Sequence, residues 1–135
     1  MVLEVPVPLL RFDLVAGRTP AELTALLDAA HAAVLEAFEV PPGDRYQVVH
    51  QHPRGELVVH DTGLGIERTD GVVVLQVTSR PRPREQKEAL HRLLAHHLRE
   101  RAGVDPGDLV VCLVENSDAD WSFGHGRAQF LTGEL

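Results

Sequence analysis

An internal duplication limits what this chain can fold into more than any other feature of its sequence. The stretch VPPGD at positions 40–44 returns as VDPGD at 104–108, an offset of 64 residues, and the same offset places Arg18 on Arg82. Two copies are too few for an extended repeat array, so the pattern favours one pseudo-symmetric domain. Each half is predicted to contain a strand, a helix, a Pro-Gly-Asp turn and a second strand.

The first half carries clear local signals for this order of elements. A short apolar strand is predicted from Pro8 to Leu14, and Thr19-Pro20-Ala21-Glu22 has the composition of a capping box that starts a helix. Apolar residues follow at helical spacing as far as Phe38. A second strand is predicted from Tyr46 to His50.

The middle of the chain, residues 51–70, is predicted to hold one more short strand, from Glu56 to Val59. The glycine-bearing stretch DTGLG at 61–65 follows it. This stretch lacks the Lys-Ser/Thr ending of a phosphate-binding loop and does not lead into a helix, so we interpret it as a plain turn.

The second half repeats the pattern. A buried strand is predicted from Val72 to Val77, a helix from Glu85 to Arg101 that ends at Gly103, and a strand from Leu109 to Val114. Each β-α-β unit should cross over right-handed and pair its strands in parallel. The prediction is an α/β (α+β) fold in which two pseudo-symmetric β-α-β units form a four-stranded mixed sheet with two helices on one face. The other face, partly apolar, would need a partner chain to cover it.

Composition excludes several classes of function. The 135 residues suffice for one domain, and 13 Lys and Arg against 20 Asp and Glu leave the chain without the basic surface of a nucleic-acid binder. No apolar run reaches the length of about 18 residues that a membrane span needs, and the start of the chain lacks the pattern of a signal peptide. We therefore expect no nucleic-acid or membrane partner and a cytoplasmic protein.

The single cysteine and the histidines give no sign of redox or metal chemistry. Cys112 lies in the apolar run LVVCLVE and is expected to be an inert core residue. His50 and His52 share one face of a strand, but no third ligand is evident. The spacing of these residues therefore predicts no metal site.

Three arginines stand where a helix should begin, in Ser79-Arg80-Pro81-Arg82-Pro83-Arg84. Positive charge is unfavourable near the positive end of the helix dipole, and this chain is acidic overall. Arg80 and Arg82 each precede a proline, which holds both in extended backbone beside the free N–H groups of the helix. We interpret the pair as an anion-binding arrangement, against the alternative of a solvated charge run.

Two further features are ambiguous on their residues alone. Asp44, in the turn after Gly43, is typical of an ordinary turn aspartate. The C-terminal segment from Asp120 to Leu131 gathers the single tryptophan and two of the four phenylalanines. That segment would either cap the core or form the wall of a pocket.

Together these pieces resemble the tautomerase superfamily and, within it, the malonate semialdehyde decarboxylase family. The resemblance runs from Pro8 to Leu135 and is carried by the stretches PLLRFDLV, GRTPAEL, DRYQVVHQ, DTGLGI, SRPRPREQK and ENSDADWSFGHGRAQFLTGEL. It implies a single tautomerase-like domain over 8–135, a homotrimer, and an amino-terminal proline as catalyst without metal or organic cofactor.

Carried over to this sequence, the resemblance gives each candidate residue a role. Pro8 would be the catalytic proline, Asp44 its acidic partner, and Arg80 and Arg82 the catalytic arginines that bind the substrate carboxylate. The apolar wall of the site would consist of Trp121, Phe123, Phe130 and Leu135. The resemblance raises Asp44 from a turn residue to a catalytic one.

The implied activity is that of a cofactor-independent enzyme acting on small oxo acids, by decarboxylation with hydration as a further reaction. One alternative is keto–enol tautomerisation of a 2-oxo acid such as phenylpyruvate. Another is a non-catalytic oligomeric binding protein, if Pro8 is not a free terminus. The expected partner of the enzyme is a small carboxylate-bearing substrate.

Residues 1–7 depart from the implied pattern because they place the Pro8 nitrogen in a peptide bond, where it has no useful basicity. We expect this N-terminal extension to be a start-site artefact. A GTG codon at position 7 is read as valine inside a chain but initiates translation as methionine. Removal of that methionine would leave Pro8 at the terminus.

Overall fold

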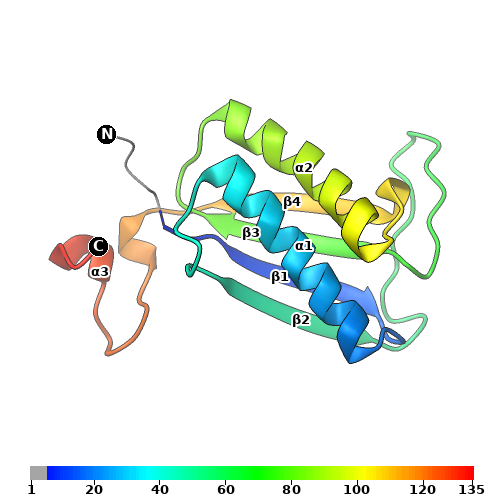
Figure 1. Ribbon diagram of the computed structural model, residues 1–135, viewed down its shortest axis with the longest axis horizontal. Helices are drawn as coiled ribbons and strands as arrows, with labels where there is room; N and C mark the ends of the chain where they lie inside the picture. Colours follow the sequence, from blue (N-terminus) through cyan, green and yellow to red (C-terminus); the bar gives the residue numbers. More distant parts are fainter. Residues whose placement is uncertain (1–5) are drawn as a thin grey trace.

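A four-stranded mixed sheet forms one layer of the molecule, and two long helices cover one of its faces (Figure 1). The computed structural model describes residues 6–135. The strands are β1 (Leu9–Val15), β2 (Tyr46–His52), β3 (Val73–Ser79) and β4 (Leu109–Glu115), in the order β2-β1-β3-β4. Strand β1 pairs in parallel with β2 and antiparallel with β3, and β3 pairs in parallel with β4. The predicted fold class is confirmed.

The duplication is visible in the bounds of the elements. Helix α1 spans Pro20–Phe38 and α2 spans Arg84–Ala102. Strand β3 and helix α2 begin and end 64 residues after β1 and α1, the offset found in the sequence. The two β-α-β units are therefore two copies of one arrangement, joined by antiparallel pairing of their first strands.

The helix ends follow the predicted signals. Thr19 is the N-cap of α1, and the reciprocal bonds of a capping box join it to Glu22. Helix α2 ends at Gly103, whose φ of 66° lies in the left-handed region that favours glycine. The helices pack on the sheet and on each other around a core with these fully buried large side chains: Phe12, Leu14, Leu26, Phe38, Leu75, Leu90, Leu94 and Leu98.

Three short helical elements flank β4 and end the described chain. The 3₁₀ turn η1 (Pro106–Asp108) precedes β4, and η2 (Asp118–Asp120) follows it. A last helical turn, α3 (Gln129–Thr132), lies at the end of the sheet where β1 begins (Figure 1).

The predicted strand at Glu56–Val59 is wrong, because this segment has no strand pairing. Side chains hold the surrounding loop instead of a ladder. Arg68 donates from Nη1 to the Gly107 carbonyl at 2.6 Å and from Nε to the His60 carbonyl at 3.2 Å. Three consecutive apolar residues at 57–59 imitate a strand, yet Val58 is 69% exposed. The plain turn at 61–65 is confirmed, with the Asp61 carboxylate accepting from two glycine amides.

The prediction for Cys112 is also wrong, since its side chain is exposed. It lies in an edge strand opposite Gln76, which is exposed as well, on the sheet face that the helices leave uncovered. The neighbours of Cys112 on either side, Val111 and Leu113, point to the other face and pack against the core. An apolar run on an edge strand can therefore have one face in the core and the other face exposed in the single chain.

Within residues 6–135, no helix combines the length and apolarity that crossing a membrane requires. In the same part of the chain, no three metal-binding side chains cluster closely enough to hold an ion.

Candidate active site

The topology brings the candidate residues to one end of the sheet. Strands β1 and β2 begin at this end, with Leu9 opposite Tyr46, while β3 and β4 finish there, with Ser79 opposite Glu115. Pro8 directly precedes β1, and the two arginines directly follow β3. The C-terminal segment after β4 returns to the same end (Figure 1).

Asp44 binds the residue that precedes Pro8. The Val7 amide donates to Oδ2 of Asp44 at 2.6 Å. Val7 has a φ of 66°, which is a rare conformation for a β-branched residue, and Pro8 is buried. In this chain the Pro8 nitrogen belongs to an amide with Val7, so it is neither basic nor nucleophilic here.

Arg82 is bound on three sides. Its Nη2 donates to the Val7 carbonyl at 2.7 Å and to the Pro6 carbonyl at 3.4 Å, while Nη1 donates to the Phe38 carbonyl at 3.1 Å. Its guanidinium also lies over the Phe38 ring, 4.5 Å from the centroid. Only 7% of the residue is exposed, and this burial, together with the nearby charge of Arg80, lowers the pKa of Arg82 to about 10 despite the opposing charge of Asp44. Arg82 therefore remains a cation at neutral pH.

Arg80 is held by the C-terminal segment. Its Nη1 donates to Oδ1 of Asp118 at 3.1 Å, and its guanidinium carbon lies 3.8 Å from the centre of the Phe130 ring. The side chain is 16% exposed. Both guanidinium groups lie over an aromatic ring, but Arg80 donates to a carboxylate, whereas Arg82 donates mainly to main-chain carbonyls.

The aromatic residues form one continuous wall. Phe123 stacks on Trp121 with centroids 5.6 Å apart, meets Phe130 edge-on at 5.4 Å, and lies 5.6 Å from the Tyr46 ring. The Trp121 indole donates to Oδ1 of Asn116 at 2.6 Å. The segment that could have capped the core is therefore packed as the side of a cleft.

Two adjoining cavities lie along this wall and share Tyr46 and Phe123. The first, of about 260 Å³, is lined by Pro6, Pro41, Asp44, Tyr46, Phe123 and Leu135. The second, of about 420 Å³, is lined by Leu9, Tyr46, Trp121, Ser122, Phe123 and Gly124. This mixture of aromatic surface and a carboxylate beside charged groups is typical of a small-molecule site.

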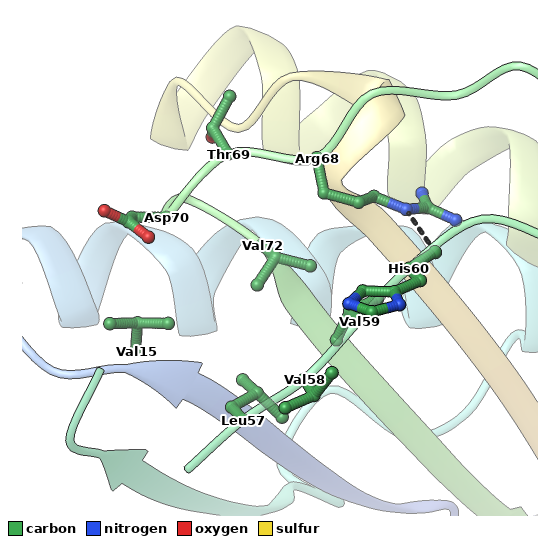
Figure 2. Close-up of a pocket in the computed structure, with 9 residues that line it drawn as sticks. All are labelled: Val15, Leu57, Val58, Val59, His60, Arg68, Thr69, Asp70 and Val72. Carbon is green, nitrogen blue, oxygen red and sulfur yellow. Dashed lines mark hydrogen bonds between the residues drawn. The ribbon is translucent and has the colours of Figure 1, made fainter. Parts of the chain in front are cut away.

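A larger cavity, of about 560 Å³, lies at the opposite end of the sheet, where β1 ends and β3 begins (Figure 2). Its charged side chains already have partners. Arg68 binds the His60 and Gly107 carbonyls, and Asp70 pairs with Arg54. We therefore place the candidate active site at the Pro8 end, where Asp44 lines the first cavity, Arg80 lies against the Phe130 ring of the aromatic wall and Arg82 binds the Val7 carbonyl.

All eight predicted site residues lie at that end of the molecule. Pro8, Asp44 and Arg82 form one cluster, and Arg80 and Phe130 form a second. Leu135 lines the same cavity as Asp44. The sequence reasoning missed Tyr46, Asn116 and Asp118. For Tyr46, its place at the start of β2 was an available signal.

Comparison with known proteins identifies the family. The sequence model described as "Tautomerase enzyme" matches residues 44–124, and a second model with the same description matches residues 8–67. The chain belongs to the tautomerase family, whose members are enzymes.

Particular relatives narrow the likeness further. The chain is 56% identical to the probable tautomerase YrdN of Bacillus subtilis (strain 168) over 128 residues, which cover 95% of this chain and 99% of the relative. Malonate semialdehyde decarboxylase, solved in wild-type, mutant and inactivated forms to explain its decarboxylase and hydratase activities, is 58% identical, with a TM-score of 0.92 and coverage of 94% and 98%.

Two more solved structures extend the comparison. A malonate semialdehyde decarboxylase inhibited by 3-bromopropiolate is 35% identical, with a TM-score of 0.90 and coverage of 94% and 97%. A fused 4-OT, solved as a wild-type symmetric trimer, is 25% identical, with a TM-score of 0.75 and coverage of 93% and 98%. The fold thus occurs in trimers.

Proposed function

We propose that this protein, in a form that begins at Pro8, decarboxylates a small oxo acid of the malonate semialdehyde type without a cofactor. One observation carries the proposal. Asp44 accepts from the amide of Val7, and Arg82 donates to its carbonyl. A carboxylate and a cation would therefore flank the position where an amino-terminal Pro8 presents its nitrogen. The likeness to malonate semialdehyde decarboxylase supports the same reading.

A free proline nitrogen gives this geometry a reaction. A secondary amine at a chain terminus has a pKa of about 8, so it is available both as an acid and as a nucleophile near neutral pH. As an ammonium it donates to the aldehyde oxygen of the substrate. The bond between C2 and the carboxylate carbon then breaks, its electron pair forms the enolate, CO2 leaves, and a proton from water restores the carbon. The product is acetaldehyde.

A covalent route uses the same residues. The neutral amine of Pro8 adds to the aldehyde and expels water, which gives an iminium ion. Cleavage of the same bond sends its electron pair toward the iminium nitrogen and forms an enamine. Protonation and hydrolysis of the enamine release acetaldehyde and regenerate the amine.

In this proposal the two arginines and the aromatic wall orient the substrate and favour loss of its carboxylate. Arg80 and Arg82 would hold the carboxylate so that its bond to C2 stands perpendicular to the carbonyl plane, where orbital overlap permits cleavage. A tight grip on the carboxylate alone would stabilise the substrate as much as the transition state, so we assign the arginines orientation more than driving force. The aromatic wall disfavours the charged carboxylate relative to neutral CO2. Asp44 would balance the charge of the Pro8 ammonium or position a water molecule.

The first seven residues are expected to block this chemistry. They turn the Pro8 nitrogen into an amide, and the Pro6 and Val7 carbonyls occupy Nη2 of Arg82. Removing residues 1–7 removes both acceptors, and a substrate carboxylate would take their place. The family match that starts at residue 8 is in line with an active chain that begins there.

Keto–enol tautomerisation is the second candidate. The aromatic wall and the probable tautomerase among the relatives favour it. Here the neutral Pro8 amine would move a proton between the enol oxygen and the neighbouring carbon of a 2-oxo acid. In either case we propose a homotrimer, which would cover the sheet face opposite the helices.

The test compares the full chain with a version that begins at Pro8, released from a cleavable leader and checked by intact mass. Both are assayed for malonate semialdehyde decarboxylation and for phenylpyruvate tautomerisation, with Arg82→Ala in the Pro8 form as the control. We expect turnover of malonate semialdehyde in the Pro8 form alone and a large loss in the control. Labelling by 3-bromopropiolate should add mass to the Pro8 peptide of that form only.

Other outcomes separate the alternatives. Faster turnover of phenylpyruvate would favour the tautomerase, and equal turnover by both forms would remove Pro8 from the mechanism. If neither form turns over a substrate or becomes labelled, the protein is a binding module and the proposal is wrong.

A further inference from the structure

The turn after β4 places one carboxylate directly on a substrate-binding arginine. Asp118, in η2, accepts from Nη1 of Arg80 at 3.1 Å. The turn is fixed from within, because the Asp120 carboxylate accepts from the backbone N–H of Ser117 at 2.8 Å and from its hydroxyl at 3.0 Å. These bonds lower the pKa of Asp120, which keeps that carboxylate charged in its capping role. The position of Asp118 is therefore set by the local fold.

Two contacts orient the Arg80 guanidinium, and the side chain is 16% exposed. Within residues 6–135, its guanidinium contacts are Nη1 with Asp118 and one face with the Phe130 ring. This arrangement leaves Nε and Nη2 as donors for an incoming anion. Because the ring blocks rotation to one side and Asp118 holds the far nitrogen, those donors have a fixed direction.

The charges of the cleft sum to a small value. Arg80 forms an ion pair with Asp118, and Arg82 lies within the influence of the Asp44 charge, so these two pairs carry no net charge. Of the neighbouring groups, Glu115 is paired with Lys87, and the Asp120 carboxylate is bound to the N–H and hydroxyl of Ser117. A protonated amine at Pro8 would add one positive charge. The cleft is therefore matched to a substrate with a single negative charge, and a second carboxylate would meet no further unbalanced cation.

We propose that Asp118 is a specificity-determining residue that positions Arg80 and makes the site prefer monocarboxylates over dicarboxylates. This inference rests on the proposed function, since it takes the cleft of Arg80 and Arg82 as the carboxylate site. Without Asp118, Arg80 would be a full unbalanced cation, and the site would favour a dianion more than it does now.

The exposure of the pair makes the inference testable without loss of the fold. Asp118 is 54% exposed in its side chain, and such half-exposed ion pairs contribute little to stability. Asp70, at the opposite end of the sheet (Figure 2), offers a control, because its side chain is 56% exposed and also pairs with an arginine, Arg54. Asp118→Asn and Asp70→Asn remove the same charge, one at the cleft and one far from it.

The experiment measures binding in the form that begins at Pro8, with propionate and malonate as probes that are not turned over. Calorimetry gives both dissociation constants for the unmutated protein, Asp118→Asn and Asp70→Asn. A charge removed about 8 Å from the second carboxylate at an effective dielectric constant near 40 predicts a gain of about fivefold in the preference for malonate. Any loss of Arg80 orientation weakens both probes alike, so the ratio isolates the charge effect. Asp70→Asn should leave the ratio unchanged.

Kinetics test the positioning role. In Asp118→Asn we expect a lower kcat on the proposed substrate because a loosened Arg80 holds the scissile bond less well, and Asp118→Glu should restore part of it. A malonate preference within twofold of the unmutated protein in Asp118→Asn would overturn the inference. Failure of propionate and malonate to bind the unmutated protein would instead overturn the carboxylate site and, with it, the proposed function.

Discussion

Asp108 is the counterpart of Asp44 in the second half of the chain, and its loss should reduce stability while leaving the active site intact. It is 3% exposed and holds the loop before β3. Its Oδ1 accepts from the Thr69 amide at 2.7 Å, and its Oδ2 accepts from the Thr69 hydroxyl at 2.5 Å. The carboxylate therefore joins the start of β4 to a segment 39 residues earlier.

The magnitude follows from these two bonds. Hydrogen bonds to a charged acceptor contribute about 1.5 kcal/mol each at the lower end, and the low end applies because Thr69 is exposed and water can replace the lost partner. Asp108→Ala should therefore reduce the free energy of unfolding by about 3 kcal/mol. For a chain of this size the midpoint of thermal unfolding should fall by about 10 °C. Asp108→Asn should cost about 1 kcal/mol, since an amide keeps an acceptor for the Thr69 N–H.

Circular dichroism at one fixed protein concentration provides the assay, because the unfolding midpoint of an oligomer depends on concentration. The comparison variant is Asp44→Asn in the form that begins at Pro8, which lacks the Val7 amide. That variant should unfold near the unmutated midpoint and lose most of its turnover. The reasoning fails if Asp108→Ala unfolds within about 2 °C of the unmutated protein, or if it loses more than about threefold in kcat/KM while folded.

Two further results are expected. Because burial and the charge of Arg80 lower the pKa of Arg82 to about 10, the KM for a carboxylate substrate of the form that begins at Pro8 should rise above about pH 9, beyond any change that accompanies the titration of the Pro8 amine near pH 8. A pH series of kcat and KM checks this, and a KM that stays constant between about pH 9 and 11 would contradict the role of Arg82. Cys112, on the uncovered face of the sheet, should react slowly with Ellman's reagent in the assembled protein and fully after denaturation; a fast reaction in the native protein would show that no partner covers this face.

The fold was predictable because its signals are local or periodic. The capping box at Thr19 and the glycine at 103 each depend on a few neighbouring residues, the repeat is periodic with an offset of 64 residues, and the structure reproduces all three. Burial was harder to predict. The apolar run around Cys112 is the same whether one or both faces are covered, and the difference depends on which layer lies on each side of the sheet.

The site was predictable only in part. Arg80 and Arg82 stand out in the sequence because they place positive charge at the start of a helix, and the structure puts both at the Pro8 end of the sheet, one against Phe130 and one on the Val7 carbonyl. Asp118 left no such mark, because its contact with Arg80 joins residues 38 apart that meet only when β3 and β4 pair. Asp44 was assigned by resemblance, since its turn context by itself favoured an ordinary structural aspartate.

The duplication also separates what the fold requires from what the chemistry requires. Arg82 donates from Nη2 to the Val7 carbonyl, and its counterpart Arg18 donates from Nη2 to the Gly71 carbonyl at 2.9 Å, with both residues of the second pair placed 64 positions from those of the first. In both halves, therefore, an arginine side chain donates to a main-chain carbonyl just before a central strand, β1 or β3. Such a contact alone does not indicate catalysis.

The two ends of the sheet differ in what accompanies this contact. In the second half, Val72 stands where the first half has Pro8, and the carboxylate of Asp108 is occupied by Thr69. In the first half, the corresponding carboxylate of Asp44 accepts from the Val7 amide and, in addition, lines a cavity together with Tyr46 and Phe123. The second half therefore acts as an internal control: it keeps the arginine and the aspartate but has no proline at the corresponding position, so the catalysis that we propose for the first end would depend on Pro8 and the cleft beside it.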